Sequence, residues 1–292
     1  MVTIISGPGQ PHIGKQLADL MSADHIDVQH KFFPDGERDL ILSDEKCDKN
    51  TIIVQSIIPP QDSNLLSLIQ LIYTAQEFGA KNISIVTPYL AYGAKDRRLL
   101  RGEVVSIYNV MRVLEATPAN KLYVIDIHNP EVLKGKEKFF HNFSAMPEFG
   151  KYFLKKNLNN PLVLAPDYGA KERVSIIGKT MNVETDFFEK NRDPISGETK
   201  LNPHEIPVKG KDVIIADEVI RTGGTIIKSI KALQEMSVGR VFVASTHLML
   251  CNNAGEKIMN AGAEEIIGTD TIPSKYSTIP VAPLIKKELE KS

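Results

Sequence analysis

The segment DVIIADEVIRTGGTIIK, residues 212–228, combines residue types that bind phosphate and hydroxyl groups. Its turn, which leads into a predicted helix, consists of Thr222, Gly223, Gly224 and Thr225. Glycines allow a ligand to approach the backbone closely, and the free N–H groups of a helix N-terminus bind anions. The two acids before the turn, Asp217 and Glu218, would repel a phosphate unless they served ribose hydroxyls or a Mg²⁺ that bridges to phosphates. An ordinary βα turn is the alternative, but paired acids after an apolar strand favour a binding site.

Polar residues also follow two other apolar runs. His128 follows the run that begins at residue 121, and Asp167 follows the run that begins at residue 161. Ligands of an open parallel sheet bind outside the carboxyl ends of its strands, so a metal or nucleotide contact is a hypothesis for both residues. Considered alone, His128 would be read as a surface histidine.

The segment YGAKDRRLLRGE, residues 92–103, is strongly basic and also follows an apolar run. Its cations are Lys95, Arg97, Arg98 and Arg101. Most such runs are solvated, but this position makes contact with a polyphosphate or with another subunit equally reasonable.

The elements that would position these residues alternate regularly along the chain. Short apolar, β-branched runs predict buried parallel strands at residues 2–6, 51–57, 82–88, 121–128, 161–167, 212–218, 240–247 and 264–270. Helical spacing lies between them. In residues 62–79, Asp62 or Ser63 can cap a helix that Gly79 ends, and its apolar stripe consists of Leu65, Leu68, Ile69, Ile72, Ala75 and Phe78. The pattern predicts an α/β fold.

This pattern runs twice, which predicts two tandem domains. We place them at residues 1–146 and 147–292, with a C-terminal tail that can cross back to the first domain. The polar segment 187–205 predicts a mobile loop or an exposed hairpin. The formal net charge of −1 gives no reason to expect a nucleic-acid or membrane partner. Two distant cysteines and the lack of a signal peptide predict a reducing, cytoplasmic location.

Six segments, in order, resemble those of the phosphoribosyl pyrophosphate synthetase (ribose-phosphate diphosphokinase) family, in its compact archaeal-like form. The resemblance spans nearly the whole chain. The similar segments are KFFPDGE (31–37), TPYLAYGAKDRR (87–98), DIHNPE (126–131), APDYGAKER (165–173), FFEKNRD (187–193) and ADEVIRTGGT (216–225).

The resemblance implies two tandem phosphoribosyltransferase-like domains, each with a mainly parallel sheet flanked by helices. It also implies Mg²⁺-dependent transfer of the diphosphoryl group of ATP to the 1-hydroxyl of ribose 5-phosphate, releasing AMP. In the family the hairpin at 31–37 reaches the ATP site of a neighbouring subunit, so a homodimer or larger homo-oligomer is implied.

The residue roles implied by the resemblance fall into four groups. Catalysis would use Lys190 and Arg192, which stabilise charge on the migrating phosphoryl group. ATP would be bound by Phe33, Asp35, Glu37, Lys95, Asp96, Arg97 and His128. The ribose phosphate would be bound by Asp167, Asp217, Glu218, Arg221, Thr222, Gly223, Gly224 and Thr225. Mg²⁺ would be held by His128 and Asp167.

Three positions depart from the family pattern. The family usually carries Arg-Gln where this chain has Ala94-Lys95, and Asp-Asp where it has Asp217-Glu218. Asp or Ser is common where this chain has Arg221, which adds a fixed positive charge beside the phosphate turn.

These departures leave two alternatives beside synthesis of 5-phosphoribosyl 1-diphosphate. One is the same transfer to a larger acceptor that keeps a ribose 5-phosphoryl end, such as ADP-ribose. The other is a catalytically inactive paralogue that regulates an active synthetase, although retention of Lys190, Arg192, His128 and Asp167 speaks against it.

Overall fold

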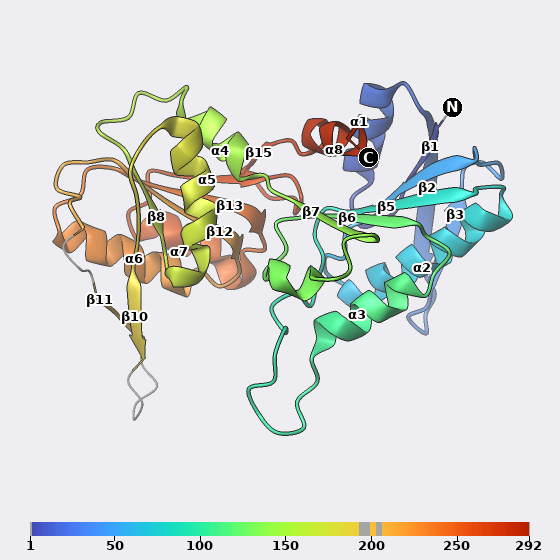
Figure 1. Cartoon of the computed structure of the whole chain (residues 1–292), viewed down its shortest axis with the longest axis horizontal. Coiled ribbons are helices and arrows are strands. Elements are labelled where there is room, and N and C mark those ends of the chain that lie inside the picture. Colours follow the sequence, from blue (N-terminus) through green and yellow to red (C-terminus); the bar gives the residue numbers. More distant parts are fainter. Residues whose placement is uncertain (1, 193–198, 203–205, 292) are drawn as a thin grey trace. The chain divides into compact units, whose positions relative to one another are not determined.

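The computed structural model describes residues 2–192, 199–202 and 206–291, with backbone alone at 190–192 and 199–202 (Figure 1). It divides into two compact units, residues 1–143 with 280–292 and residues 144–279. Both are α/β, and the predicted mainly parallel sheets are confirmed. Among the described residues, no helix has both the length and the apolar character needed to cross a membrane.

The first unit is built on a seven-stranded sheet of order β3-β2-β1-β4-β5-β6-β7. Its strands are β1 (Val2–Ser6), β2 (Asp24–Phe32), β3 (Arg38–Leu42), β4 (Asn50–Val54), β5 (Asn82–Thr87), β6 (Lys121–Ile125) and β7 (Phe140–Phe143). All pairs are parallel except β2 with β3, which form an antiparallel hairpin. Ile52 and Ile53 point to opposite faces of β4 and are both buried, as expected for a sheet covered on two sides.

The helices of this unit are α1 (Pro11–Met21), α2 (Gln61–Glu77), α3 (Ser106–Glu115) and α8 (Ala282–Leu289), with a 3₁₀ turn at Pro130–Leu133. Helix α2 begins one residue before the predicted caps, with Pro60 at the N-cap and no side-chain cap. Asp62 instead accepts a hydrogen bond from the hydroxyl of Tyr92. The predicted stripe buries Leu68, Ile72 and Ala75.

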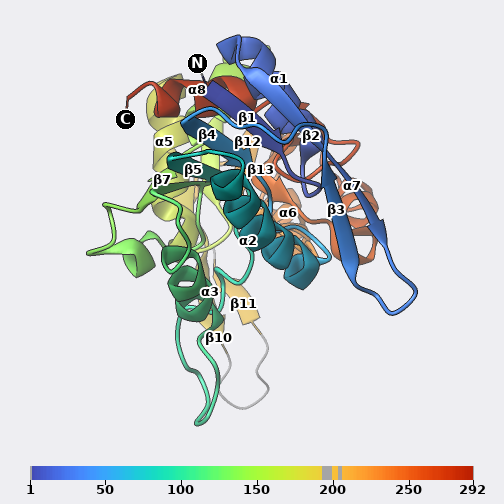
Figure 2. The ribbon, with the colours of Figure 1, turned by 90° about the vertical axis from the view of Figure 1, so that its right-hand side faces the viewer.

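The C-terminal helix α8 groups with the first unit, whereas the sequence-based division assigned residues 147–292 to the second domain. It packs against α1, where the ammonium of Lys286 donates to the carbonyl of Leu20 at 3.0 Å. Figure 2 shows the two helices side by side. This tail pairing joins sequence ends, so local periodicity alone could not reveal it.

The second unit contains an all-parallel six-stranded sheet of order β15-β14-β13-β12-β8-β9. Its strands are β8 (Leu162–Ala165), β9 (Thr185–Phe187), β12 (Val213–Ile220), β13 (Val241–Leu248), β14 (Glu265–Thr269) and β15 (Ser277–Ile279). Helices α4 (Met146–Phe153) and α5 (Lys171–Met181) supply one hydrophobic cluster. Helices α6 (Gly224–Glu235) and α7 (Ala254–Asn260) supply the cluster on the other face. Two 3₁₀ turns, Tyr168–Ala170 and Cys251–Asn253, complete the unit.

Within the predicted loop-or-hairpin segment 187–205, two short strands form an antiparallel pair, β10 (Glu189–Arg192) with β11 (Thr199–Asn202). Lys190 pairs with Leu201, and Arg192 with Thr199. The hairpin form of the prediction is therefore the one the described backbone adopts.

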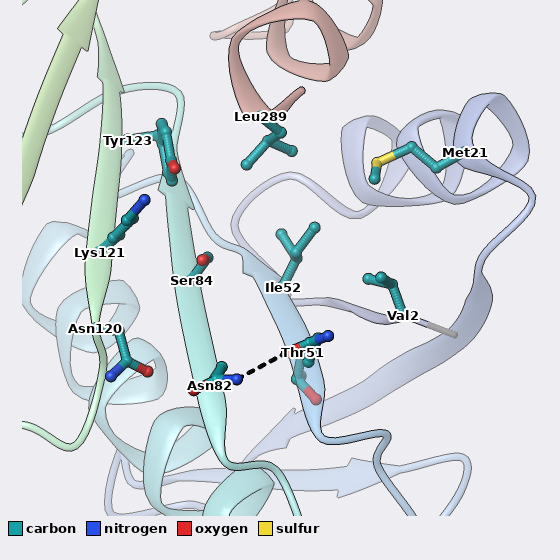
Figure 3. Close-up of a pocket in the computed structure, with 11 residues that line it drawn as sticks. Val2, Met21, Thr51, Ile52, Asn82, Ser84, Asn120, Lys121, Tyr123 and Leu289 are labelled. Atoms are coloured by element: carbon teal, nitrogen blue, oxygen red, sulfur yellow. Dashed lines mark hydrogen bonds between the residues drawn. The ribbon is translucent and has the colours of Figure 1, made fainter. Parts of the chain in front are cut away.

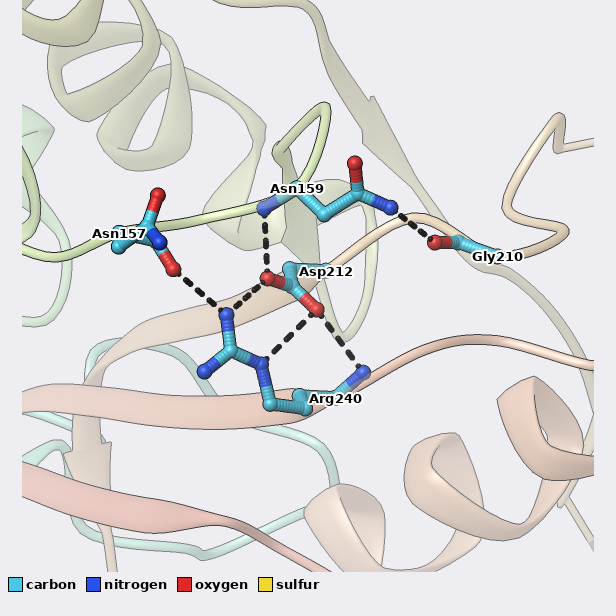
Figure 4. Close-up of polar contacts among 5 residues, drawn as sticks. All are labelled: Asn157, Asn159, Gly210, Asp212 and Arg240. Atoms are coloured by element: carbon cyan, nitrogen blue, oxygen red, sulfur yellow. Dashed lines mark hydrogen bonds and ion pairs between the residues drawn. The ribbon is translucent and has the colours of Figure 1, made fainter.

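A polar brace joins the amino ends of the strands in the second unit (Figure 4). Asp212, directly before β12, accepts hydrogen bonds from the backbone N–H of Asn159 at 2.7 Å and of Arg240 at 3.0 Å. The guanidinium of Arg240 also donates to both carboxylate oxygens. Because Arg240 directly precedes β13, this brace fixes the two central strands relative to each other.

Candidate active site

The turn at Thr222–Thr225 lies at the carboxyl end of β12 and leads into α6, as predicted. Gly223 is the N-cap of α6 with a φ of +73°, a conformation that glycine adopts without strain. A Cβ on Gly223 would also lie 3.0 Å from the side chain of Ile258. Thr222 and Gly224 are exposed and Thr225 is half-buried. The turn therefore leaves backbone N–H groups at the helix N-terminus, where an anion binds.

The acids before this turn have different surroundings. Asp217 is half-buried, and its carboxylate accepts a hydrogen bond from the backbone N–H of Glu218 at 2.8 Å. Burial raises the pKa of Asp217 well above its usual value, and the hydrogen bond and charge of the Glu218 carboxyl act in the same direction. Glu218 is only 3% exposed and forms an ion pair with Arg173, with 3.1 Å between Oε2 and Nη1. The predicted pair thus comprises one carboxyl at the site and one committed to an arginine.

Asp167 follows β8 in extended backbone and caps the 3₁₀ turn at Tyr168–Ala170. Its Oδ1 accepts a hydrogen bond from the N–H of Gly169 at 3.0 Å. The carbonyl of Gly169 in turn accepts one from Arg173 at 3.0 Å. The loop 165–173 is therefore ordered by its own backbone and by the ion pair to β12.

The first unit brings the basic segment 92–103 next to the histidine loop 126–131. The amide of Asn129 donates to the carboxylate of Asp96 at 2.7 Å. A Cβ on Gly93 would lie 3.5 Å from the Cβ of His128, which is itself exposed. Arg97 is also exposed. Asp96, Arg97 and His128, which the sequence assigns to one ATP site, thus lie on adjoining loops at one end of the sheet.

Lys95 does not point freely from this segment. Its ammonium pairs with Glu103, whose Oε2 also accepts the N–H groups of Leu99 at 2.7 Å and Leu100 at 3.1 Å. The hydrogen bond from Lys95, with those from the two amides, lowers the pKa of Glu103 to about 2. Glu103 therefore closes the basic loop on itself.

The hairpin β2–β3 presents the third group of predicted residues. Phe33, Asp35 and Glu37 are all exposed at its turn, where the carboxylate of Asp35 accepts the N–H of Glu37 at 3.1 Å. Phe32 and Ile41 are 50% and 55% exposed. Exposed apolar side chains on a protruding hairpin are typical of a surface that contacts another protein.

The predicted catalytic pair, Lys190 and Arg192, has its backbone on β10. The side chains of both residues lie outside the described part of the chain. Their role stays a prediction.

Mg²⁺ takes oxygen ligands and usually binds through one or two carboxylates together with substrate phosphates. Among residues 2–192, 199–202 and 206–291, no cluster of three or more His, Cys, Asp or Glu side chains is arranged to hold a metal ion. Asp167 fits a Mg²⁺ site with few protein ligands, because it is a half-buried carboxylate at a strand end and supplies oxygen ligands. The imidazole of His128 is a poorer match for this hard cation.

A cavity of about 530 Å³ lies at the opposite end of the first sheet (Figure 3). Val2, Asn50, Asn82 and Lys121, which line it, are the first residues of β1, β4, β5 and β6. Ligand sites of parallel sheets form at the carboxyl ends, so this cavity does not correspond to the candidate site.

Sequence reasoning missed three residues that order the site: Glu103, Asn129 and Arg173. Arg173 lies four residues after Gly169, a helical spacing that would have allowed its bond to the Gly169 carbonyl to be expected. Asn129 and Glu103 carry no such signal, because their partners depend on how the loops fold.

Two family models match most of the chain. The family model for the N-terminal domain of ribose phosphate pyrophosphokinase matches residues 2–117, and that for the phosphoribosyl transferase domain matches residues 149–267. A ribose-phosphate pyrophosphokinase from Sulfurisphaera tokodaii is 36% identical to this chain. The alignment covers 98% of this chain and 99% of that protein. One from Pyrococcus furiosus is also 36% identical, with 97% and 98% covered.

The fold has a solved counterpart as well. The crystal structure of phosphoribosylpyrophosphate synthetase from Mycobacterium smegmatis matches with a TM-score of 0.85 at 22% identity. The match covers 99% of this chain and 97% of that one.

Proposed function

The chain belongs to the ribose-phosphate pyrophosphokinase family, and we propose that it transfers the diphosphoryl group of ATP to the 1-hydroxyl of ribose 5-phosphate. The products are 5-phosphoribosyl 1-diphosphate and AMP. The observation that carries the proposal is the turn 222–225, with its left-handed Gly223, at the N-terminus of α6 and at the carboxyl end of β12, the strand that contains Asp217. The archaeal relatives support it because the match covers nearly the full length of both chains.

The acceptor would bind at the turn. The exposed N–H groups and the hydroxyls of Thr222 and Thr225 suit the 5-phosphate, and Asp217 suits a ribose hydroxyl. Arg221 is exposed, and its side chain has no hydrogen bond or ion pair to the rest of the described chain. Its guanidinium can therefore add a charged contact to the same phosphate.

ATP would bind along the basic segment and the histidine loop. Arg97 and His128 are exposed to solvent and could contact the nucleotide, while a hydrogen bond from Asn129 orients Asp96. Phe33, Asp35 and Glu37 would complete the nucleotide site of a neighbouring subunit, which is why we also propose a homo-oligomer.

The migrating phosphoryl group would be stabilised by Lys190 and Arg192. Transfer between oxygens requires in-line positioning and compensation of negative charge, and two cations on a hairpin provide the second requirement. Mg²⁺ would neutralise part of the diphosphate charge. Asp167 and the substrate phosphates would hold it, and the imidazole of His128 is the weaker of the two predicted ligands.

The relatives from Sulfurisphaera tokodaii and Pyrococcus furiosus are both ribose-phosphate pyrophosphokinases, and they give the alternatives stated above no support. An assay distinguishes them directly. Purified protein is incubated with ATP, Mg²⁺ and either ribose 5-phosphate or ADP-ribose, and AMP and the diphosphorylated product are quantified. We expect equimolar AMP and 5-phosphoribosyl 1-diphosphate with ribose 5-phosphate. Absence of AMP release with this acceptor would refute the proposal.

Oligomer formation is tested separately. Light scattering gives the mass of the wild-type chain and of a double variant that combines Phe32→Ser and Phe33→Ser. We expect the wild-type mass to be a multiple of the chain mass and the double variant to dissociate or to lose affinity for ATP. A monomeric wild type with full activity would exclude the shared site.

A further inference from the structure

We propose that Glu218 does not bind the acceptor but positions the loop 165–173 by holding Arg173, which leaves Asp217 as the acid that serves the ribose. This inference rests on the proposed function for its kinetic test. It divides between two tasks a pair of neighbouring acids that the sequence treats as equivalent.

The Glu218 carboxyl contacts its neighbour Asp217 and, in addition, a residue of another element. Ile214 and Ala216 of β12 belong to the hydrophobic cluster beneath α5, whereas Val213 and Ile215 belong to the cluster beneath α6. The ion pair with Arg173 places the carboxylate of Glu218 beside α5, the helix that contains this arginine. The phosphate turn leads into α6, on the other side.

The burial of Glu218 is consistent with a structural partner rather than a ligand. Its side chain is 4% exposed and that of Arg173 is 14% exposed. A buried carboxylate that lost its arginine would retain an uncompensated charge, so the pair must stay together. A carboxylate that also had to accept ribose hydroxyls would need more open surface than this.

Arg173 connects Glu218 to Asp167, the carboxylate proposed to hold the Mg²⁺ that neutralises part of the diphosphate charge. Its Nη1 lies 3.1 Å from Glu218 Oε2 and 3.0 Å from the carbonyl oxygen of Gly169. The N–H of Gly169 donates to Asp167 at 3.0 Å. The path from Glu218 to Asp167 therefore passes through a single arginine and a single glycine.

Side-chain length makes this specific to the chain. Glutamate is longer than aspartate by one methylene, about 1.5 Å. An aspartate at position 218 would move the carboxylate away from Arg173 by up to that distance, beyond hydrogen-bond reach unless the backbone moved. The Glu218 departure thus matches the distance to this arginine.

The test uses three variants: Glu218→Gln, Glu218→Asp and, as the matched control in the neighbouring acid, Asp217→Asn. Each is assayed with ribose 5-phosphate and with 2-deoxyribose and 3-deoxyribose 5-phosphate. Binding of pyrophosphate is measured by calorimetry without turnover. Circular dichroism and thermal unfolding establish that each variant is folded.

If Glu218 positions the loop, Glu218→Gln lowers kcat and pyrophosphate affinity by about tenfold or more, as loss of a supporting contact does at such sites. The preference for ribose over the deoxy acceptors stays at the wild-type value. The kcat and the pyrophosphate affinity of Glu218→Asp fall between those of Glu218→Gln and those of the wild type. Asp217→Asn, in contrast, brings the preference for ribose 5-phosphate over one of the deoxy analogues close to unity.

A Glu218→Gln protein that loses the preference for ribose and binds pyrophosphate normally would overturn the inference. So would a Glu218→Gln protein with unchanged kinetics and unchanged pyrophosphate binding. If the wild type shows no turnover, the proposed function has failed, and pyrophosphate affinity of the variants still decides the role of Glu218.

Discussion

Arg240 donates to both carboxylate oxygens of Asp212, from Nε to Oδ1 at 3.2 Å and from Nη2 to Oδ2 at 2.6 Å. The two residues directly precede β12 and β13, whose opposite ends lead to the candidate site. This brace is buried on the aspartate side, at 3% exposure, and partly open on the arginine side, at 44%. Its contribution to stability should therefore be measurable but below that of a fully buried pair.

We predict that Asp212→Asn lowers the free energy of unfolding by about 2 kcal/mol near neutral pH, reduced from the value for buried pairs because Arg240 is partly solvated. Burial alone would raise the pKa of Asp212, but the bonds from Arg240 and two backbone amides outweigh it and lower the pKa. A lowered pKa means that the stabilisation is present above the ordinary aspartate pKa and is lost as pH falls through the folded value. Urea unfolding at several pH values should show that the difference in free energy of unfolding between wild type and Asp212→Asn decreases in acid. A difference that does not change with pH would contradict this prediction.

The glycine turn yields a second prediction. Gly223→Ala places a Cβ at a φ of +73° and 3.0 Å from Ile258, so it should lower stability by about 1–2 kcal/mol. It should also raise the KM for ribose 5-phosphate, because the N–H groups of the turn shift. The matched control is Gly210→Ala, with a φ of +70° but no atom within 4 Å of the added Cβ. Equal effects of both variants on KM would show that backbone strain, not the turn, is responsible.

The fold was largely predictable because buried parallel strands need continuous apolar residues. Every run predicted as a strand forms one, since residues such as Ile52 and Ile53 are covered on both faces. The hairpin β2–β3 was expected at residues 31–37 from the family resemblance but not from apolar runs, because its residues remain largely exposed. The division at residue 147 left helix α8 in the second domain, whereas the helix crosses back to the first unit, as the sequence allowed for the C-terminal tail, and packs on α1.

The site was predictable only where chemistry and position coincide. Asp167 and the turn after Asp217 follow strands of the second unit's sheet, and His128 follows a strand of the first unit's sheet; the carboxyl ends of parallel strands lie at one edge of each sheet. Sequence could not divide the roles of Asp217 and Glu218, since that depends on Arg173 in another helix. It also could not show that Lys95, which is predicted to bind ATP, forms an ion pair with Glu103.

That pairing gives a third prediction, for Glu103→Gln. Loss of the carboxylate frees Lys95 and the amides of Leu99 and Leu100, so the basic loop loosens. We expect the KM for ATP to rise while the KM for ribose 5-phosphate and the thermal stability stay near wild type. Since the pKa of Glu103 is depressed to about 2, its contribution is lost only as pH falls through that value, and the KM for ATP should show no titration of this group in mild acid.

The control for Glu103 is Glu137→Gln in the same unit. Glu137 also accepts a backbone N–H, from Gly135 at 2.9 Å, and its pKa is likewise lowered by such bonds. It lies outside the basic loop, so its loss should not change the KM for ATP. An equal rise in both variants would mean that general surface charge, and not the closed loop, sets nucleotide affinity.

The last prediction concerns Arg221, the exposed cation that directly precedes the phosphate turn. Arg221→Ser, which introduces a residue common in the family, should raise the KM for ribose 5-phosphate about tenfold, the effect of one charge-assisted contact. The rise should shrink at high ionic strength, because a solvated charge pair is screened. The matched control is Lys231→Ser, which removes an exposed cation from α6 away from its N-terminus. Steady-state kinetics at two salt concentrations separates them: if Lys231→Ser has the same effect, or Arg221→Ser has none, the Arg221 guanidinium does not contact the acceptor.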